Sequence, residues 1–453
     1  GAANFQLMNV AHNENHITAT DNAQVELYHN GSQKFETTTT GISVTGSIQA
    51  SQEYPTIRPI LDLNFAATKT LDRRITFTRD SLGTYTDDMG IVRYASNNVP
   101  RFDHDPTTGE SLGLLLEESR TNLVSNSITM TATGTGSVST NTTETTAPDG
   151  TNTAVKVTKS ALWNGYNEGA STQGTISWFA KKADNRYVQF QTSGVGLNNS
   201  NIGGVSKNSV FDFDTETFTT NQHGISFVKY SNGWYRFYRT YTTSATYSGS
   251  SILLYPQTDA SNGVGDTIDE TGTVYGWGIQ YEVGAFLTSY IPTSGSTVTR
   301  AADLAAIRRT NFTDFYNSDE GTIYCEFTHG VRPWHFCDAD TSPSQRFFGF
   351  SDNSGGIRVG RNASGWTYLS APTTGSYSRG DDIKSAVSYG PTSFSVGAFG
   401  QVADSGTTNA NTGIDRLLFY QDTSNPDSNG TIRALKYYNK RLPNAQLQGL
   451  TQQ

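Results

Sequence analysis

The chain has 453 residues, of which 35% are hydrophobic and 16% charged, and its formal net charge is −9. No basic tract and no run of about 18 apolar residues is present, so neither nucleic-acid binding nor membrane insertion is expected. The aromatic content of 11% and the 44 glycines favour many short strands joined by turns, and they argue against disorder. The composition therefore predicts an all-β protein.

The first residues, GAANFQLMNV, lack the basic start and apolar core of a signal peptide. They also lack an initiator Met, and we expect a fragment of a longer protein. In the segment 1–54, Val25 and Leu27 alternate with polar residues, and Asn30-Gly31 favours a hairpin turn. So thin a segment is typically stable only when copies associate. We expect a slender trimeric fibre shaft.

Residues 55–122 are expected to form a connecting β module. It ends in the most highly charged stretch of the chain, RFDHDPTTGESLGLLLEESR, at 101–120.

This charged stretch has three interpretations. The first is a metal site, because Asp103, His104 and Asp105 are side chains of the type that binds metal ions. The second is a glycoside-cleaving carboxylate pair, Glu110 with Glu117. The third, favoured by the turn sequence DPTTG, is a structural joint in which Arg101 and Arg120 pair between chains and fix the register of a trimer.

Residues 123–297 carry strands at regular spacing with turn signals between them. The stretch WYRFYRTY shows the alternation clearly, since Trp234 and Arg236 face opposite to Tyr235 and Phe237. Antiparallel strands of this kind are expected to stack as two sheets in a jelly roll.

A second set of strands follows over 298–453, after a break marked by Pro292 and Gly295. The last stretch, RLPNAQLQGLTQQ, spaces Leu442, Leu447 and Leu450 as a helix does. We expect a second antiparallel β-sandwich closed by a short C-terminal helix.

Cys325 and Cys337 are too few for a disulfide framework. Free thiols are favoured, and a bridge within one hairpin is the alternative. With His329 and His335 they form a C-x3-H-x5-H-x-C pattern, which matches no common zinc signature. We expect buried cysteines and surface histidines here, with a zinc site as the alternative.

Four stretches resemble phage tail-fibre and receptor-binding proteins. VELYHNGSQKFETTTTGISVTGSI is similar to fibre shafts, and the stretch from LDLNFAATKTL to EESRTNLV resembles a module that recurs in tail proteins. SNGWYRFYRTYT and VYGWGIQYEVGAFLTSYIPTSGSTVTRAAD resemble a carbohydrate-binding-module-like jelly roll. GTIRALKYYNKRLPNAQLQGLT is similar to the end of a concanavalin-like, or laminin-G-like, sandwich.

The resemblance implies a homotrimeric tail fibre of the virion, assembled in the cytoplasm of the host bacterium. Its N-terminus would join other tail or baseplate proteins, and its tip would bind a host surface glycan or lipopolysaccharide without cleaving it. Two alternatives stay open: a tailspike-like depolymerase, and a purely structural virion spacer. No Ser-His-Asp arrangement, nucleotide-binding loop or short β-helix repeat is present, so no enzyme activity is expected.

Glycan binding requires flat rings and polar side chains on the surface, because sugars stack their C–H faces on aromatic rings. Trp178, Trp234 and Trp277 lie inside regular strands and are expected in the core. The candidates for contact with a glycan are aromatic residues in predicted loops and two nearby arginines suited to an acidic sugar: Trp163, Tyr166, Trp334, Trp366, Tyr368, Arg358 and Arg361.

No cofactor is expected. The acidic loops DFDTET (212–217) and DTIDE (266–270) are alternatives for a structural Ca²⁺, with solvated turns as the favoured interpretation.

Overall fold

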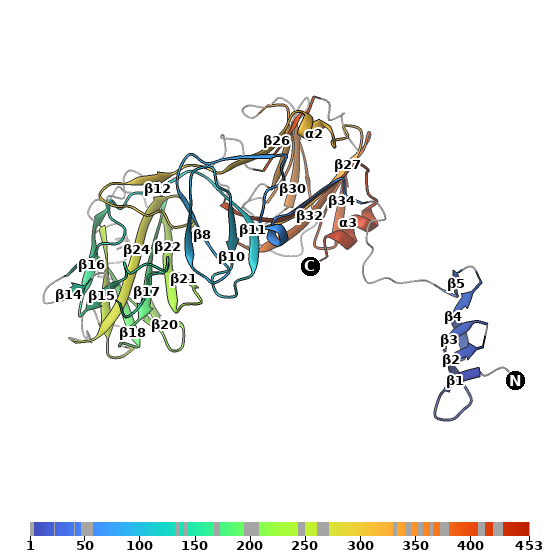
Figure 1. Ribbon diagram of the computed structural model, residues 1–453, viewed down its shortest axis with the longest axis horizontal. Helices are drawn as coiled ribbons and strands as arrows, with labels where there is room; N and C mark the ends of the chain where they lie inside the picture. The colour runs from blue at the N-terminus through green and yellow to red at the C-terminus, as the bar shows by residue number, and fades with distance from the viewer. Residues whose placement is uncertain are drawn as a thin grey trace. The chain divides into compact units, whose positions relative to one another are not determined.

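Antiparallel strands make up nearly all the regular structure, which confirms the predicted all-β class (Figure 1). The three helices among the described residues are short: α1 (Phe65–Thr68), α2 (Thr310–Thr313) and α3 (Asn444–Leu450). None of the described helices is long and apolar enough to cross a membrane. This computed structural model describes residues 4–21, 23–39, 41–46, 58–132, 136–139, 143–166, 173–193, 208–242, 250–260, 271–328, 333–339, 346–351, 357–362, 366–371, 380–405, 413–419 and 429–452.

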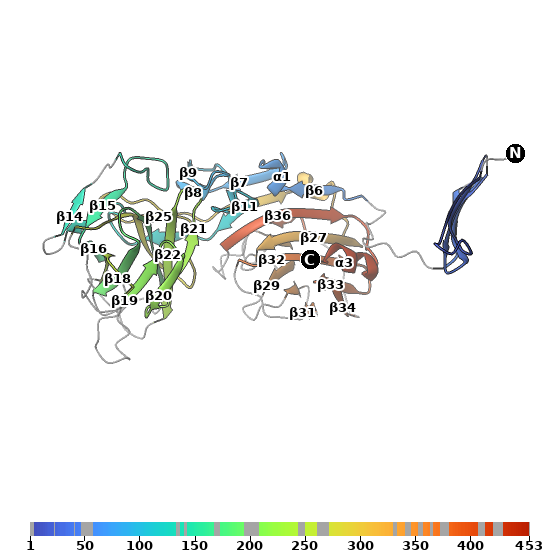
Figure 2. The same cartoon turned by 90° about the horizontal axis from the view of Figure 1, so that it is seen from below.

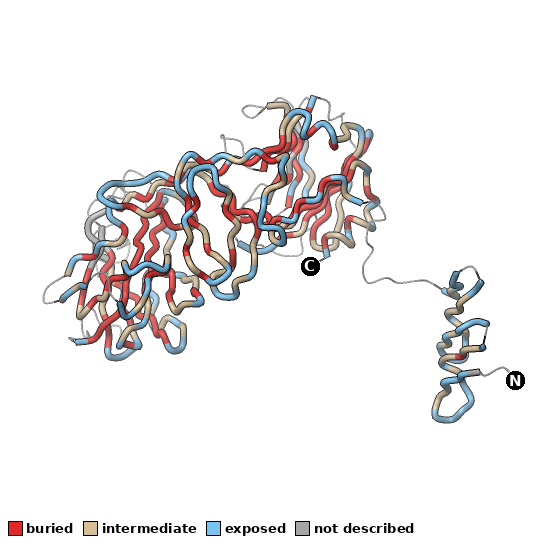
Figure 3. Tube along the Cα trace, viewed as in Figure 1, coloured by how far each residue is buried: buried red, intermediate tan, exposed pale blue. Residues whose placement is uncertain are grey.

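The chain divides into two compact units, Gly1–Tyr54 and Pro55–Gln453. The first unit is a five-stranded antiparallel sheet in chain order: β1 (Asn4–Met8), β2 (Asn15–Thr20), β3 (Val25–His29), β4 (Ser32–Thr38) and β5 (Gly41–Val44). Asn30 and Gly31 join β3 to β4 with φ of 48° and 69°, which confirms the predicted hairpin turn. Among the described residues of this unit only Thr18 is buried. Figure 3 shows this unit almost entirely in the colours of intermediate and exposed residues.

The jelly roll consists of two six-stranded antiparallel sheets. One sheet has the order β13 (Thr131–Ala132), β16 (Ala161–Tyr166), β23 (Ser250–Gln257), β18 (Tyr187–Ser193), β19 (Asn208–Asp212) and β20 (Thr217–Asn221). The other has the order β14 (Ser137–Ser139), β15 (Val155–Thr158), β24 (Thr273–Val283), β17 (Gln173–Lys182), β22 (Trp234–Thr242) and β21 (Ser226–Lys229). Their inner faces share one apolar core that includes Trp178, Phe190 and Phe237.

The outer face of the second sheet is also buried. Phe179, Trp234 and Trp277 lie on this face and form a second apolar cluster with Tyr290 and Val92. Trp178, Trp234 and Trp277 are each 1% exposed or less, which confirms their prediction as core residues. Because both faces of β22 are covered along its first half, Trp234, Tyr235, Arg236 and Phe237 are all buried, whereas Thr240 near its end is exposed.

The C-terminal sandwich consists of two larger sheets with one core between them. One has the order β10 (Arg101–His104), β11 (Ser111–Glu117), β36 (Asn429–Tyr438), β27 (Gly321–Thr328), β32 (Asp382–Tyr389), β33 (Phe394–Ala398) and β34 (Gln401–Ser405), with β6 (Leu61–Asn64) also paired to β36. The other has the order β31 (Trp366–Ser370), β30 (Ile357–Asn362), β29 (Arg346–Ser351), β28 (Trp334–Cys337), β35 (Arg416–Leu418), β26 (Leu304–Arg308) and β7 (Ile75–Thr78).

Helix α3 closes this sandwich, as predicted. Leu447 is fully buried on it and packs with Leu442 and Tyr438 in a small cluster of its own. The side of the C-terminal sandwich that carries α3 can be followed in Figure 2.

The expectation that 55–122 is a separate connecting module is wrong. Its strand β6 pairs with β36, its strand β7 pairs with β26, and β11 pairs with the other half of β36. The segment therefore completes both sheets of the C-terminal sandwich, and the jelly roll is inserted between these strands and the rest of that sandwich. Non-local strand pairing of this kind leaves no local signal in the sequence.

The jelly roll joins the C-terminal sandwich through a two-stranded stalk. Its entry strand β12 (Arg120–Asn122) pairs antiparallel with its exit strand β25 (Val298–Arg300). Next to the stalk stands a small hairpin of β8 (Gly83–Thr86) and β9 (Val92–Ala95). A hydrogen bond of 3.0 Å from Asn429 Nδ2 to the Leu287 carbonyl links the C-terminal sandwich to the segment after the jelly roll.

Candidate functional site

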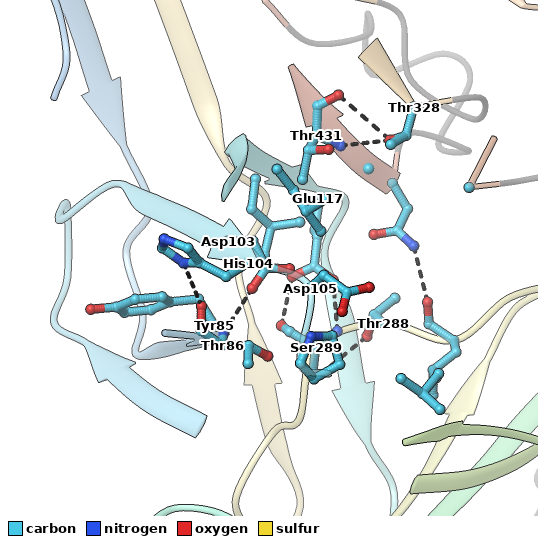
Figure 4. Close-up of a pocket in the computed structure, with 18 of the residues that line it drawn as sticks. Tyr85, Thr86, Asp103, His104, Asp105, Glu117, Thr288, Ser289, Thr328 and Thr431 are labelled. Carbon is cyan, nitrogen blue, oxygen red and sulfur yellow. Dashed lines mark hydrogen bonds between the residues drawn. The ribbon is translucent and has the colours of Figure 1, made fainter. Parts of the chain in front are cut away.

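A cleft with a volume of about 530 Å³ opens where the hairpin β8–β9, the jelly roll and the C-terminal sandwich meet (Figure 4). Part of the charged stretch at 101–120 forms one wall, and Tyr230, Arg236 and the segment 287–290 form another. Thr328, Asp382 and the start of β36 complete it. Hydroxyls, carboxylates and tyrosine rings thus face one space from three parts of the fold.

Asp103 and His104 lie side by side at the end of β10 and both bind Thr86. The Thr86 N–H donates to Asp103 Oδ1 at 2.7 Å, and His104 Nδ1 lies 3.0 Å from the Thr86 carbonyl. Burial raises the pKa of Asp103 to about 6, although the Thr86 N–H opposes this shift. His104 is buried, and its Nε2 has no hydrogen-bond partner within the described part of the chain.

The turn after these residues has the chemistry predicted for DPTTG. Asp105 accepts hydrogen bonds from the backbone N–H groups of Thr107 and Thr108, at 2.9 and 2.7 Å, and Gly109 has a φ of +73°. Asp105 is therefore occupied in shaping the turn.

Behind the cleft wall, three buried arginines share two buried carboxylates. Glu117 pairs with Arg101 at 2.6 Å and with Arg300, and Asp303 pairs with Arg79 at 3.1 Å and with Arg101. All five side chains are at most 1% exposed. These five residues form a buried ion cluster, and the charge of Glu282, which is also fully buried, acts on Arg300 as well.

The buried ion cluster holds Glu117 firmly ionised. Burial alone would raise the pKa of Glu117, but the charges of Arg300 and Arg101 and two hydrogen bonds from Ser289 outweigh burial. The result is a pKa of about 2. The Ser289 N–H donates to Oε1 at 2.7 Å and the Ser289 hydroxyl to Oε2 at 2.6 Å, so both carboxylate oxygens are engaged.

The expected pairing of Arg101 and Arg120 between chains is wrong. Arg101 is fully buried within one chain, and Arg120 pairs with Glu118 of the same chain at 2.5 Å and lies over the Phe286 ring. The ion pairs of Arg101 and Arg120 are formed with residues of the same chain near the stalk. The charged stretch is therefore a joint within one chain.

The glycosidase pair Glu110 and Glu117 is not supported by the geometry. Glu117 is locked by its arginines, and Glu110 is exposed and pairs with Arg433 at 2.5 Å. Neither carboxylate stands free on the cleft.

Arg236 enters the cleft from the outer face of the jelly roll. It is 5% exposed and donates to the Thr288 carbonyl at 2.9 Å and to Ser177 Oγ at 3.1 Å. The alternation in WYRFYRTY placed Arg236 on the face of Trp234, but it did not mark that face as buried. The signal that would have found this residue is a strand whose two faces are both rich in aromatics.

Trp334 is not a surface aromatic, which corrects the prediction of a glycan-binding loop there. It lies in β28 at 1% exposure, with its ring centroid 5.3 Å from that of Phe347 and 5.5 Å from that of Phe336. The neighbouring Gly and Pro suggested a loop, but the ring fills the core of the C-terminal sandwich.

The other candidates all lie on strands, although the aromatic ones among them were predicted in loops. Arg358 is exposed on β30, and Tyr368 is 52% exposed on the adjacent strand β31. In the register, Arg358 faces Ser370 and Gly360 faces Tyr368, which places Arg358 and Tyr368 on the same face of the sheet. Two further candidates, Arg361 and Trp366, belong to these strands, and Trp163 and Tyr166 belong to β16; the description of these four extends to the backbone alone.

Both cysteines are free and buried, as predicted, whereas His335, which was predicted on the surface, is only 4% exposed. Cys325 lies in β27 of one sheet and Cys337 in β28 of the opposite sheet, so they do not share the hairpin that the zinc alternative needed. His329 lies outside the described residues. Within the described ranges, no three His, Cys, Asp or Glu side chains gather as metal ligands do.

The carboxylates of the acidic loop at 212–217 form ion pairs with Lys and Arg side chains. Asp212 pairs with Arg186 at 2.6 Å, Asp214 with Lys182 at 2.5 Å, and Glu216 with Lys229. These partners use the carboxylates that Ca²⁺ would need. The second acidic loop, 266–270, lies outside the described residues.

No family model and no curated protein matches the chain. Among solved structures, it is similar to the CBM40 module of the Ruminococcus gnavus IT-sialidase bound to α2,3-sialyllactose, at 17% identity over 32% of this chain and 88% of that one, with a TM-score of 0.26. The laminin α2 LG1–3 region matches at 10% identity over 63% and 66%, with a TM-score of 0.23. A tail fibre protein of an E. coli phage matches at 12% identity over 73% and 41%, with a TM-score of 0.19. At such TM-scores, these likenesses carry no argument about function.

Proposed function

We propose that the chain is a receptor-binding tail fibre protein that attaches a phage to a glycan on the host surface, and that the cleft is its glycan site. The observation that carries this proposal is the polar cleft at the junction of two β-sandwiches. Its volume of about 530 Å³ lies in the range of small-ligand sites. The sequence resemblance to tail-fibre modules supports the same role.

The lining of the cleft has the chemistry that sugars require. The Tyr85 ring supplies flat apolar surface, and Thr431 supplies a hydroxyl that has no hydrogen-bond partner among the described residues. Asp103, which is only partly buried, is an acceptor for sugar hydroxyls. A few convergent polar groups beside aromatic surface are typical of sites that fix the orientation of a ligand.

The first unit supports the trimeric part of the proposal. The apolar side chains of Phe5, Leu7 and Ile42 are 61%, 47% and 60% exposed. They lie on a sheet in which almost every described residue is at least partly exposed. A small sheet with no covered face is marginal in water, and copies of the same sheet would cover these side chains. We propose a homotrimer that joins other tail or baseplate proteins through its N-terminus, as part of the virion.

The depolymerase alternative has one observation in its favour. Asp103 has a pKa of about 6, as a general acid for glycoside cleavage requires. Such cleavage also needs a second free carboxylate, and both oxygens of Glu117 are already engaged. The arrangement therefore favours binding over cleavage.

The test is a glycan array probed with the intact oligomer, followed by incubation of the protein with polysaccharide from a bound host. Binding without shortening of the polysaccharide is the expected result. Shortened chains would replace the adhesin by a depolymerase, and an array with no bound glycan would leave the spacer role. Sedimentation that gives a monomer would overturn the trimer.

A further inference from the structure

Arg236 is a buried cation with which no carboxylate of the described residues pairs. Within the described part of the chain no carboxylate forms an ion pair with it, and its two hydrogen bonds go to the neutral oxygens of Thr288 and Ser177. Its Nε–H has no acceptor there. The Phe179 ring, 5.4 Å from the guanidinium carbon, is its only cation–π partner among the described aromatic rings.

A charge buried in this way is costly unless a counter-charge or a ligand compensates it. The opposite wall of the cleft does not supply one. Behind Glu117 the buried ion cluster pairs its two carboxylates with its own three arginines, and the charge of the buried Glu282 also acts on Arg300, so these carboxylates are already engaged.

No acidic side chain that lines the cleft pairs with Arg236 within the described residues. Glu110 pairs with Arg433, and Asp105 binds the N–H groups of its own turn. Asp103 accepts a hydrogen bond from the Thr86 N–H, and its pKa of about 6 leaves it ionised at neutral pH, but it forms no ion pair with Arg236 among the described residues. Asp382 is exposed, so water screens its charge.

We propose that the glycan bound in this cleft is acidic, and that the carboxylate of one sugar unit binds at Arg236. A guanidinium is suited to this task because its planar N–H groups match a carboxylate. This inference rests on the proposed glycan-binding function and adds the class of sugar to it.

The experiment compares acidic oligosaccharides with their carboxyl-reduced forms by titration calorimetry on the intact oligomer. Oligogalacturonate, hyaluronan fragments and sialyl oligosaccharides serve as probes, each beside its reduced counterpart. We expect at least one acidic probe to bind ten or more times tighter than its reduced form. Equal affinity for the two forms overturns the acidic-sugar inference and keeps the glycan-binding function, whereas absence of binding to every saccharide overturns the function itself.

Variants of Arg236 test whether this residue causes the preference for the acidic form. Arg236→Gln should bring the acidic and reduced forms to equal affinity, and Arg236→Lys should keep part of the difference because it keeps the charge. Arg186→Gln is the matched control: Arg186 belongs to the same jelly roll, pairs with Asp212 and does not line the cleft. If Arg236→Gln does not fold, Arg236→Lys decides, and an unchanged acidic preference in a folded Arg236→Gln overturns the inference.

Discussion

Replacing Glu117 by Gln tests the buried ion cluster directly. Gln has nearly the shape of Glu but no charge, so the substitution leaves Arg101 and Arg300 without their shared carboxylate while the packing is kept. The cluster would then hold three arginines with Asp303 as the one remaining acid.

The size of the effect follows from the pKa of Glu117, which is about 2 in the folded chain against 4.5 for the ordinary side chain. At about 1.4 kcal/mol for each pKa unit, the folded environment stabilises this carboxylate by roughly 3.5 kcal/mol. Removing one partner of a buried ion pair generally costs about 3–5 kcal/mol. We therefore expect Glu117→Gln to lower the free energy of unfolding by about 3–5 kcal/mol.

The sign of the pH dependence is also fixed. A carboxylate whose pKa is lowered on folding contributes its full stabilisation above its unfolded pKa and loses it as pH falls through the folded value. The wild-type chain should therefore lose stability between about pH 4.5 and pH 2. The Glu117→Gln variant should lose less over this interval.

Urea unfolding followed by tryptophan fluorescence measures the change, because Trp178 reports on the jelly roll and Trp334 on the C-terminal sandwich. Glu110→Gln is the control, since its exposed pair with Arg433 is of a kind worth about 0–1 kcal/mol. If Glu117→Gln shifts the unfolding midpoint no more than Glu110→Gln does, the buried ion cluster does not stabilise the junction as argued.

Asp103, Trp334 and Gly113 each provide a further test. Wild-type stability should fall by up to about 3 kcal/mol as pH rises from about 4 to about 6, because burial raises the pKa of Asp103 to about 6; melting temperatures of Asp103→Asn should lack this fall. Trp334→Ala should cost about 3–5 kcal/mol in urea unfolding, whereas Tyr368→Ala, at an exposed position, should stay within about 0.5 kcal/mol. Gly113→Ala should strongly reduce the yield of folded protein, because Gly113 has a φ of +95° and an added Cβ would lie 2.2 Å from the Ile432 carbonyl oxygen; a normal yield would contradict the β11–β36 register.

The sequence by itself determined the local structure of this protein. The alternation of WYRFYRTY, the Asn30-Gly31 turn and the leucine spacing near the C-terminus specify a strand, a hairpin and a helix, because each depends on residues that are neighbours in the chain. The same holds for the turn at Asp105, whose side chain binds its own backbone.

Only the tertiary structure decided where these elements meet. Glu117 is hydrogen-bonded to Asp303, which lies 186 residues away in the sequence, and to Arg300, which lies 183 residues away. No spacing in the sequence indicates such distant partners. Strand β6 lies against β36 at the other end of the chain, which turned an expected connector into part of a sandwich. Trp334 and Arg236 are buried for the same reason: a second layer covers a face whose own sequence does not show that it will be covered.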